Sequence, residues 1–279
     1  MIARHEFNAM GTTVELLVEA HDTSAPFAAV EAEFERLEQI MSRFRRDSEL
    51  SLLNDVGELD ASLDLTEVLS LACEARERTG GRFDPTTYDA LVAAGYDRTF
   101  GELPADSVNG RAPARCGGAI EIRGRHIRLE PGFHVDLGGI GKGFAAERGA
   151  ERLALAGPCL VSAGGDVAVR GVPSHGFWAV AVEDGPTLAL IAGGLATSGS
   201  DRRRWRHGGD EQHHLIDPST AAPAESDLLR VTAAGRDAVD AEVSAKALFL
   251  AGRAAAETAG IPAVLVTVEG ETVLTGGIA

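Results

Sequence analysis

The segment from Asp136 to Gly143 constrains the fold of this chain more than any other stretch. It reads Asp-Leu-Gly-Gly-Ile-Gly-Lys-Gly, so that one acid, one cation and four glycines fill eight positions. Apolar residues precede it, and the residues that follow have the spacing of an amphipathic helix. Glycines cluster where the backbone takes positive φ angles or passes close to a ligand, and a helix N-terminus presents free amide N–H groups. The segment therefore predicts a strand-to-helix turn that binds an anion, with a phosphate as the first candidate.

Two known phosphate-binding motifs can be compared with this segment. The Walker A motif requires Gly-x-x-x-x-Gly-Lys-Ser/Thr, and only Gly141 and Lys142 fit it. Asp136 and Gly143 stand at its other two fixed positions, which excludes the motif. The dinucleotide pattern Gly-x-Gly-x-x-Gly/Ala fits Gly141, Gly143 and Ala146, but the acid that it expects about 20 residues further on is missing at that spacing. This second pattern stays open as an alternative.

The charge of the chain limits its partners. Its 279 residues include 42 acids against 26 lysines and arginines, which gives a formal net charge of −16 at pH 7. Such a protein would repel nucleic acids and anionic membrane surfaces, so we expect no nucleic-acid binding. A phosphate ligand then requires a local cation, and Lys142 stands among the glycines.

The N-terminal segment from Met1 to Asn8 contains polar and charged residues where a signal peptide would carry its apolar region. No apolar run approaches the roughly 18 residues of a membrane span. We therefore expect a cytoplasmic protein without membrane insertion. Cys73, Cys116 and Cys159 lie far apart, without the spacing of a metal or redox site, and are interpreted as structural thiols.

Apolar periodicity predicts a mixed α/β chain. The predicted strands are Thr12–Glu19, Phe133–Leu137, Cys159–Ala163, Val167–Gly171, Trp178–Glu183 and Leu188–Ala192. The predicted helices are Pro26–Met41, Leu65–Arg78, Phe144–Leu155 and Asp237–Arg253, with hairpins at Ala119–Glu130 and Ile261–Thr275. Asp97–Gly118 is interpreted as irregular, and the basic run Arg202–Arg206 as a solvated loop. Because no linker is long enough to separate independent domains, we expect residues 1–279 to form one domain or two interlocked subdomains.

Polar motifs recur at the ends of these elements. They are Thr79-Gly-Gly-Arg-Phe-Asp-Pro85, Ser162-Ala-Gly-Gly-Asp166, Ala196-Thr-Ser-Gly199 and His213-His-Leu-Ile-Asp-Pro218. Each one alone is explained as a turn or a helix cap. Three further segments accompany them in order, namely Met10-Gly-Thr12, Met41-Ser-Arg-Phe-Arg-Arg-Asp-Ser-Glu-Leu-Ser-Leu-Leu-Asn54 and Ala247-Leu-Phe249.

Taken together with Asp136–Gly143, these motifs resemble the FAD:protein FMN transferases of the ApbE type. The resemblance runs from Met10 to Phe249 and covers most of the chain. It implies a mixed α/β fold with mixed sheets flanked by helices. It also implies that FMN moves from FAD, the donor substrate, to a threonine hydroxyl of an acceptor protein, with Mg²⁺ at the pyrophosphate and AMP as leaving group. Hydrolysis of FAD to FMN and AMP, and non-catalytic FAD binding, are the alternative functions.

The resemblance also implies which residues contact FAD. They are Met10, Phe44, Arg82, Phe83, Asp84, Asp136, Lys142, Gly164, Gly165, Thr197, Ser198 and Ile216. Phe44 stands where the family usually has tyrosine, and its ring can still stack on flavin or adenine. A lysine at a helix N-terminus opposes the helix dipole, which favours a functional interpretation of Lys142. From the residues alone, Asp136 is equally explained as a helix cap.

The catalytic residues implied by the resemblance are His214 and Asp84. His214 matches a histidine near the reacting phosphate, where an imidazole with a pKa near 6.5 suits proton transfer. Asp84 is a candidate to orient the acceptor hydroxyl. Because it precedes a proline, it is also explained as a turn residue.

The resemblance places the metal site at the main-chain oxygen of Gly139 and at Glu242 and Lys246. The family has aspartate and threonine at the last two positions. Glutamate can bind a hard cation, but an ammonium group offers no lone pair and repels a metal. Two interpretations follow: Glu242 and Lys246 form an ordinary i,i+4 pair on a helix, or the Lys246 ammonium, anchored by Glu242, replaces Mg²⁺. The second is favoured and predicts that chelation leaves FAD affinity unchanged.

Overall fold

The computed structural model describes residues 1–106 and 114–278, and the chain divides into two compact units. Unit 1 comprises Met1–Glu38, Ile140–Ser198 and Asp227–Ala279, and unit 2 comprises Gln39–Gly139 and Gly199–Ser226. Each unit combines segments that are remote in the sequence. The boundary between Gly139 and Ile140 falls inside the glycine-rich segment. The choice between one domain and two subdomains stays a prediction, whereas the mixed α/β class is confirmed.

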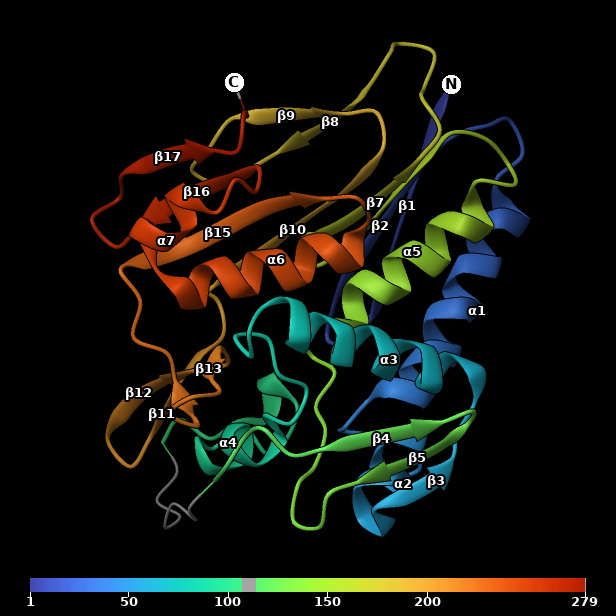
Figure 1. Ribbon diagram of the computed structural model, residues 1–279. Coiled ribbons are helices and arrows are strands. Elements are labelled where there is room, and N and C mark those ends of the chain that lie inside the picture. The colour runs from blue at the N-terminus through green and yellow to red at the C-terminus, as the bar shows by residue number, and fades with distance from the viewer. Residues whose placement is uncertain (107–113, 279) are drawn as a thin grey trace. The chain divides into compact units, whose positions relative to one another are not determined.

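Unit 1 contains an eight-stranded sheet with the order β1-β2-β6-β7-β10-β15-β16-β17 (Figure 1). These strands are β1 (Ile2–Ala9), β2 (Thr12–Glu19), β6 (Cys159–Ala163), β7 (Asp166–Arg170), β10 (Gly193–Gly199), β15 (Leu228–Gly235), β16 (Ala263–Thr267) and β17 (Thr272–Thr275). Neighbours β1–β2, β2–β6, β6–β7, β7–β10, β15–β16 and β16–β17 pair antiparallel. A separate hairpin joins β8 (Trp178–Ala181) to β9 (Thr187–Leu190).

The first hairpin shows how local sequence sets this sheet. In β2, Val14, Leu16 and Val18 are fully buried and alternate with less buried residues, which is the two-residue period of a strand with one covered face. The turn before β2 consists of Met10 and Gly11, with φ angles of 52° and 67°. Two positive φ angles in a two-residue connection match the twist of a hairpin. Glycine takes such an angle without strain, but methionine does not.

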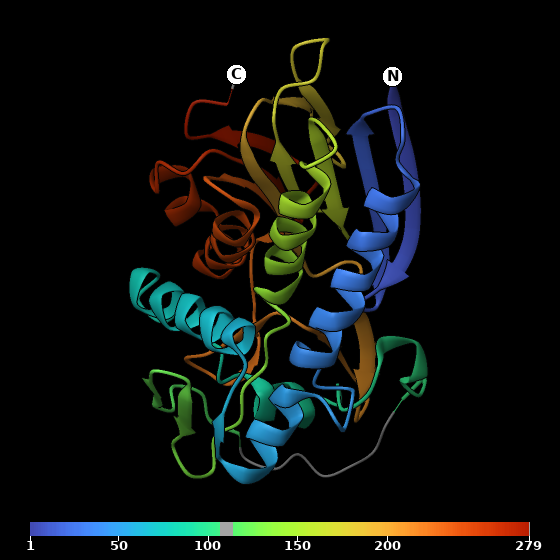
Figure 2. The same cartoon turned by 90° about the vertical axis from the view of Figure 1, so that its right-hand side faces the viewer.

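Helices of unit 1 cover one face of its sheet (Figure 1 and Figure 2). They are α1 (Ser24–Met41), α5 (Gly141–Leu153), α6 (Ala238–Ala251) and α7 (Arg253–Thr258), with the last three residues of α1 assigned to unit 2. Helices α5 and α6 approach closely at Gly143, where a Cβ atom would lie 2.7 Å from the main-chain oxygen of Ala238. A larger residue at position 143 would force these two helices apart.

Unit 2 is built from short elements. Its helices are α2 (Glu49–Val56), α3 (Leu63–Arg78) and α4 (Tyr88–Ala93), with a 3-10 turn at Phe100–Glu102. Its strands are β3 (Glu58–Asp60), β4 (Ile120–Arg123), β5 (His126–Leu129), β11 (Arg204–His207), β12 (Asp210–His213), β13 (Ile216–Asp217) and β14 (Ala222–Pro223). Strands β3, β5 and β4 form one sheet, while β11–β12 and β13–β14 form two-stranded pairs. Ser48 caps α2 by accepting from the Ser51 N–H at 3.0 Å.

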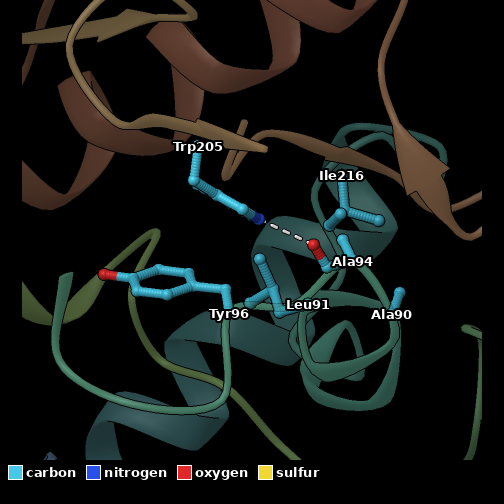
Figure 3. Close-up of a cluster of buried hydrophobic side chains, with 6 residues drawn as sticks. All are labelled: Ala90, Leu91, Ala94, Tyr96, Trp205 and Ile216. Carbon is cyan, nitrogen blue, oxygen red and sulfur yellow. Dashed lines mark hydrogen bonds between the residues drawn. The ribbon is translucent and has the colours of Figure 1, made fainter. Parts of the chain in front are cut away.

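A buried cluster in unit 2 joins parts of the chain that are more than 100 residues apart. It consists of Ala90, Leu91, Ala94, Tyr96, Trp205 and Ile216 (Figure 3). The indole N–H of Trp205 donates to the main-chain oxygen of Ala94 at 2.7 Å. The solvated loop predicted for Arg202–Arg206 is therefore wrong in part, because β11 alternates an apolar residue among its basic ones and buries Trp205.

Most predicted elements of unit 1 are confirmed, since β2 and β6 have their predicted bounds, β16 and β17 form the hairpin predicted at Ile261–Thr275, and α5 begins three residues earlier than expected. Strands β1, β10 and β15 were not predicted. The strand predicted at Phe133–Leu137 is wrong. There the Asn54 side chain bonds both main-chain groups of Val135, at 2.9 and 2.8 Å, and takes the place of a partner strand.

The segment Asp97–Gly118, predicted as irregular, lies partly outside the described residues, which exclude 107–113. Its described part contains the 3-10 turn and no helix or strand besides it. Among the described residues, no helix combines the length and the apolar character needed to cross a bilayer.

Candidate functional site

The two ends of the glycine-rich segment take part in two different ion networks. Lys142, near its C-terminal end, belongs to a network in unit 1. Asp136, at its N-terminal end, belongs to a network in unit 2. We call these the Lys142 network and the Arg43 network.

The Lys142 network consists of Lys142, Asp166, Glu242 and the main chain of Gly143. The Lys142 Nζ atom contacts the Asp166 carboxylate and lies 2.6 Å from Oε1 of Glu242. The second oxygen of Glu242 accepts from the N–H of Gly143 at 2.8 Å. The side chains of Asp166 and Glu242 are only 2% and 5% exposed, whereas that of Lys142 is 20% exposed. The Lys142 side chain is thus the least buried of the three.

Three elements bring these groups together. Lys142 lies in the first turn of α5, Asp166 is the first residue of β7, and Glu242 lies in α6. The glycines Gly164 and Gly165, with φ angles of 64° and 102°, make the tight turn that places Asp166. This is the conformational freedom that glycine supplies.

The charges in this network shift each other's protonation. Burial alone would lower the pKa of the Lys142 ammonium, but the Asp166 and Glu242 carboxylates outweigh it and raise this pKa above its usual value. Burial and the Glu242 carboxylate raise the pKa of Asp166 to about 7, against the opposing effect of Lys142. Both directions follow from two buried acids that share one cation.

Three other predicted residues of unit 1 lie in the turn between β1 and β2 or near the end of β10. Met10 has a positive φ angle and donates its main-chain N–H to Glu38 at 3.1 Å. Thr197 shares a hydrogen bond of 2.8 Å with Thr232, and Ser198 is 8% exposed. Met10 holds a left-handed conformation that favours glycine, and its contact with FAD stays a prediction.

Gly164, besides making the turn before Asp166, has no room for a side chain. A Cβ atom there would lie 2.4 Å from Oγ1 of Thr12. The close approach of these two predicted motifs, Met10-Gly-Thr12 and Ser162–Asp166, therefore depends on this glycine.

The Arg43 network surrounds a guanidinium group that is 5% exposed. Its Nε atom lies 2.8 Å from Oδ2 of Asp136, and its Nη1 atom donates to the main-chain oxygen of Tyr96 at 2.8 Å. Its Cζ atom is 4.2 Å from the ring centroid of Phe44 and 4.5 Å from that of Tyr96. Among the described residues, its buried Nη2 atom makes no hydrogen bond.

Phe44 and Asp136, two of the predicted FAD contacts, are therefore held by the same guanidinium. Phe44 is 36% exposed and so keeps part of its ring available to a ligand. Asp136 accepts from the N–H of Gly138 at 2.9 Å and donates its own N–H to Pro85 at 2.8 Å. Its side chain orders the first turn of the glycine-rich segment.

Asp84 uses both carboxylate oxygens inside unit 2. One oxygen accepts from the N–H and the hydroxyl of Thr86 at 2.7 and 2.6 Å. The other lies 3.4 Å from Nε of Arg76. Asp84 therefore orders the turn before α4, and its catalytic function stays a prediction. Of its neighbours in the motif, Arg82 is exposed and Phe83 is 1% exposed.

His214 follows β12 and precedes the fully buried Ile216 of β13. The neighbouring His213 donates from Nε2 to the main-chain oxygen of Ala224 at 3.0 Å and accepts the N–H of Leu215 at Nδ1. Burial lowers the pKa of His213, which favours this neutral form. His213 thus fixes the chain on both sides of His214, the candidate base.

The predicted metal residues do not fit a divalent cation. Both oxygens of Glu242 already accept hydrogen bonds, one of them from an ammonium group. Lys246, which is 7% exposed, lies one helical turn further along α6 and has no lone pair when protonated. Gly139 is the last residue before the boundary between the two units, and its contribution to a metal site stays a prediction. Within residues 1–106 and 114–278, no group of three or more His, Cys, Asp or Glu side chains has a metal-binding arrangement.

Two central residues were missed in the sequence. Asp166 ends the Ser162–Asp166 motif, and Arg43 directly precedes Phe44 in the Met41–Asn54 motif. Their presence inside recognised motifs was the available signal. The contacts of these residues could not be predicted from the motifs, because the networks join residues that are remote in the sequence. Lys142 and Glu242, for example, are 100 residues apart.

Comparisons with known proteins point to one family. A sequence model described as the ApbE family matches residues 10–276. The FAD:protein FMN transferase of Escherichia coli (strain K12) is 24% identical over 270 residues, covering 87% of this chain and 77% of that protein. The transferase of the same name from Treponema pallidum (strain Nichols) is 29% identical over 265 residues, covering 81% and 72%.

Solved structures agree in fold. The ApbE protein of Thermotoga maritima superimposes with a TM-score of 0.84 at 23% identity, covering 99% of this chain and 97% of that chain. The apo flavinyl transferase ApbE of Pseudomonas stutzeri gives 0.83 at 22% identity, covering 100% and 98%. At such identities these likenesses establish the fold.

Proposed function

The chain belongs to the ApbE family, and we propose that it transfers FMN from FAD to a threonine hydroxyl of an acceptor protein, with release of AMP. The observation that carries the proposal is Lys142, which stands beside the glycine-rich turn and whose side chain is 20% exposed. It supplies the local positive charge that a pyrophosphate needs in a chain with a net charge of −16. FAD is a substrate in this reaction, and no redox step is involved.

The reaction is a displacement at phosphorus. The threonine oxygen bonds to the FMN phosphorus while the bond from that phosphorus to the bridging oxygen breaks. AMP leaves with the bridging oxygen, and the hydroxyl proton passes to a base. The protein must stabilise the charge on the phosphate oxygens and hold the attacking and leaving oxygens in line.

The residues of this chain can be assigned to these tasks. Lys142 stabilises the phosphate charge as a point charge. The exposed part of the Phe44 ring offers a stacking surface to an aromatic ring of FAD. His214 is the proposed base, on a segment whose conformation is fixed by the hydrogen bonds of His213.

A direct test follows the products. The protein is incubated with FAD and an acceptor protein that carries a threonine flavinylation motif, and AMP and protein-bound FMN are measured by mass spectrometry. We expect equal amounts of AMP and modified acceptor, and no modification of an acceptor with valine in place of that threonine. AMP with free FMN would show FAD hydrolysis instead, and bound FAD without any product would show a non-catalytic binding protein.

Variants test the base. We expect His214→Asn to lower the transfer rate by about 100-fold, the usual contribution of general base catalysis. His21→Asn changes an exposed histidine by the same substitution and serves as the control. If both variants transferred FMN at the same rate, His214 would not be the base.

A further inference from the structure

When Asp166 is ionised, the side chains of the Lys142 network and of Lys246 carry equal numbers of positive and negative charges. Asp166 and Glu242 supply two carboxylates, and Lys142 and Lys246 supply two ammonium groups. All four residues belong to unit 1, and Lys246 lies four positions after Glu242 on the same helix. Side chains with this spacing are neighbours on a helix surface.

This balance of charges matters because three of the four side chains are buried. Asp166, Glu242 and Lys246 are 1%, 4% and 7% exposed. Water screens such charges weakly, so each one must be compensated by the protein or by a bound ion. The adjacent Glu147 pairs with Arg170 and adds no net charge.

The residue at position 246 decides whether a bound ion is needed. With threonine there, as in the family motif, the same group would have one more negative than positive charge and would attract a cation. With Lys246 the balance is already complete. A divalent cation would enter a neutral, buried group close to two ammonium ions, which repel it.

The geometry of Glu242 points in the same direction. Its Oε1 atom faces the Lys142 ammonium at 2.6 Å, and its Oε2 atom faces the Gly143 N–H at 2.8 Å. A metal at either oxygen would have to displace a donor that already compensates the carboxylate. The ammonium group that contacts the Glu242 carboxylate is thus that of Lys142, whereas the sequence suggested that of Lys246.

We propose that the ammonium groups of Lys142 and Lys246 together take the place of a divalent metal, so that this protein binds the FAD pyrophosphate without Mg²⁺. The charge balance does not depend on the proposed function. Only the inference that FAD binds without Mg²⁺ rests on it. Lys142 has the more exposed side chain of the two and contacts both carboxylates, and Lys246 completes the compensation of the buried carboxylates.

The first experiment measures metal binding without FAD or acceptor. The full chain is titrated with MnCl₂ and free Mn²⁺ is measured by electron paramagnetic resonance. We expect the double variant Glu242→Asp/Lys246→Thr to bind Mn²⁺ about tenfold more tightly than the wild-type protein, or more. Lys246→Met removes the charge without adding a ligand and should fall between the two. If the wild-type protein bound Mn²⁺ as tightly as the double variant, the proposal would be overturned.

The second experiment measures FAD affinity by flavin fluorescence, in EDTA and in MgCl₂. We expect equal affinities for the wild-type protein and a Mg²⁺-dependent affinity for the double variant. A tenfold loss of wild-type affinity in EDTA would overturn the proposal. A wild-type protein that excludes Mn²⁺ but transfers no FMN would contradict the proposed function and support this inference. If the double variant does not fold, the wild-type and Lys246→Met titrations decide the question.

Discussion

The Lys142 network in unit 1 and the Arg43 network in unit 2 both hold a cation against buried carboxylate, but they use different properties of that cation. Lys142 is a point charge between two carboxylates. The guanidinium of Arg43 faces one carboxylate, one carbonyl oxygen and the rings of Phe44 and Tyr96. The first network depends on charge, and the second depends also on the planar shape of arginine. The proposed function assigns the phosphate charge of FAD to unit 1 and one of its aromatic rings to unit 2.

Removal of the Lys142 ammonium should give the largest effect. Lys142→Met leaves two buried carboxylates without their shared cation, and we expect it to lower the free energy of unfolding by about 3–5 kcal/mol. Urea denaturation at pH 7.5 measures this change. Arg128→Met breaks a pair with Glu121 in which both side chains are about half exposed, and should leave the unfolding midpoint nearly unchanged. Equal losses in the two variants would mean that Lys142 is not a buried counter-ion.

The Arg43 network should respond to shape as well as charge. We expect Arg43→Met to lower the free energy of unfolding by about 3 kcal/mol, because it leaves Asp136 buried without its cation. Arg43→Lys keeps a charge but loses the ring stacking and the second hydrogen bond, and should restore less than half of that loss. Full recovery in Arg43→Lys, measured by urea denaturation, would remove the distinction between the two networks. Arg98→Lys, at an exposed pair, is the control.

The ring of Phe44 should affect the ligand more than the fold. Because it is 36% exposed, we expect Phe44→Leu to change stability little and to weaken FAD binding about fivefold, the value of about 1 kcal/mol of aromatic stacking. Fluorescence titration with FAD measures the change. Phe177→Leu alters a ring of similar exposure, 43%, and should leave FAD affinity unchanged. An unchanged affinity in Phe44→Leu would argue against a stacking surface in unit 2.

The two units should also differ in the sign of their pH dependence. In unit 1 the folded-state pKa of Asp166 is raised from 3.8 to about 7, so its contribution to stability is complete below pH 3.8 and is lost as the pH rises towards 7. In unit 2 the pKa of His213 is lowered from 6.5, so its contribution is present above pH 6.5 and is lost as the pH falls through the lowered pKa. Urea unfolding of Asp166→Asn and His213→Gln between about pH 4 and 8 should show opposite slopes relative to the wild-type protein. Parallel slopes would contradict this assignment.

Local patterns were most reliable where each residue's neighbours in sequence are also its neighbours in space. The apolar and β-branched residues of Thr12–Glu19 predicted β2, and the helical spacing of Phe27, Val30 and Phe34 predicted α1. The apolar pattern wrongly predicted a strand at Phe133–Leu137, because the remote Asn54 supplies the hydrogen bonds that a neighbouring strand would make. It also failed at β11, where Ala94 provides the partner of Trp205.

By itself, the sequence determined the family, the mixed α/β class and the glycine-rich turn with Lys142 as its cation. These properties depend on residue identity and short-range sterics, which a local pattern contains. Only the tertiary structure decided that Asp166 and Glu242 face Lys142, and that Arg43 holds Phe44 and Asp136. Those contacts join residues up to 100 positions apart. Packing of whole elements sets which charges meet, and no local pattern carries that information.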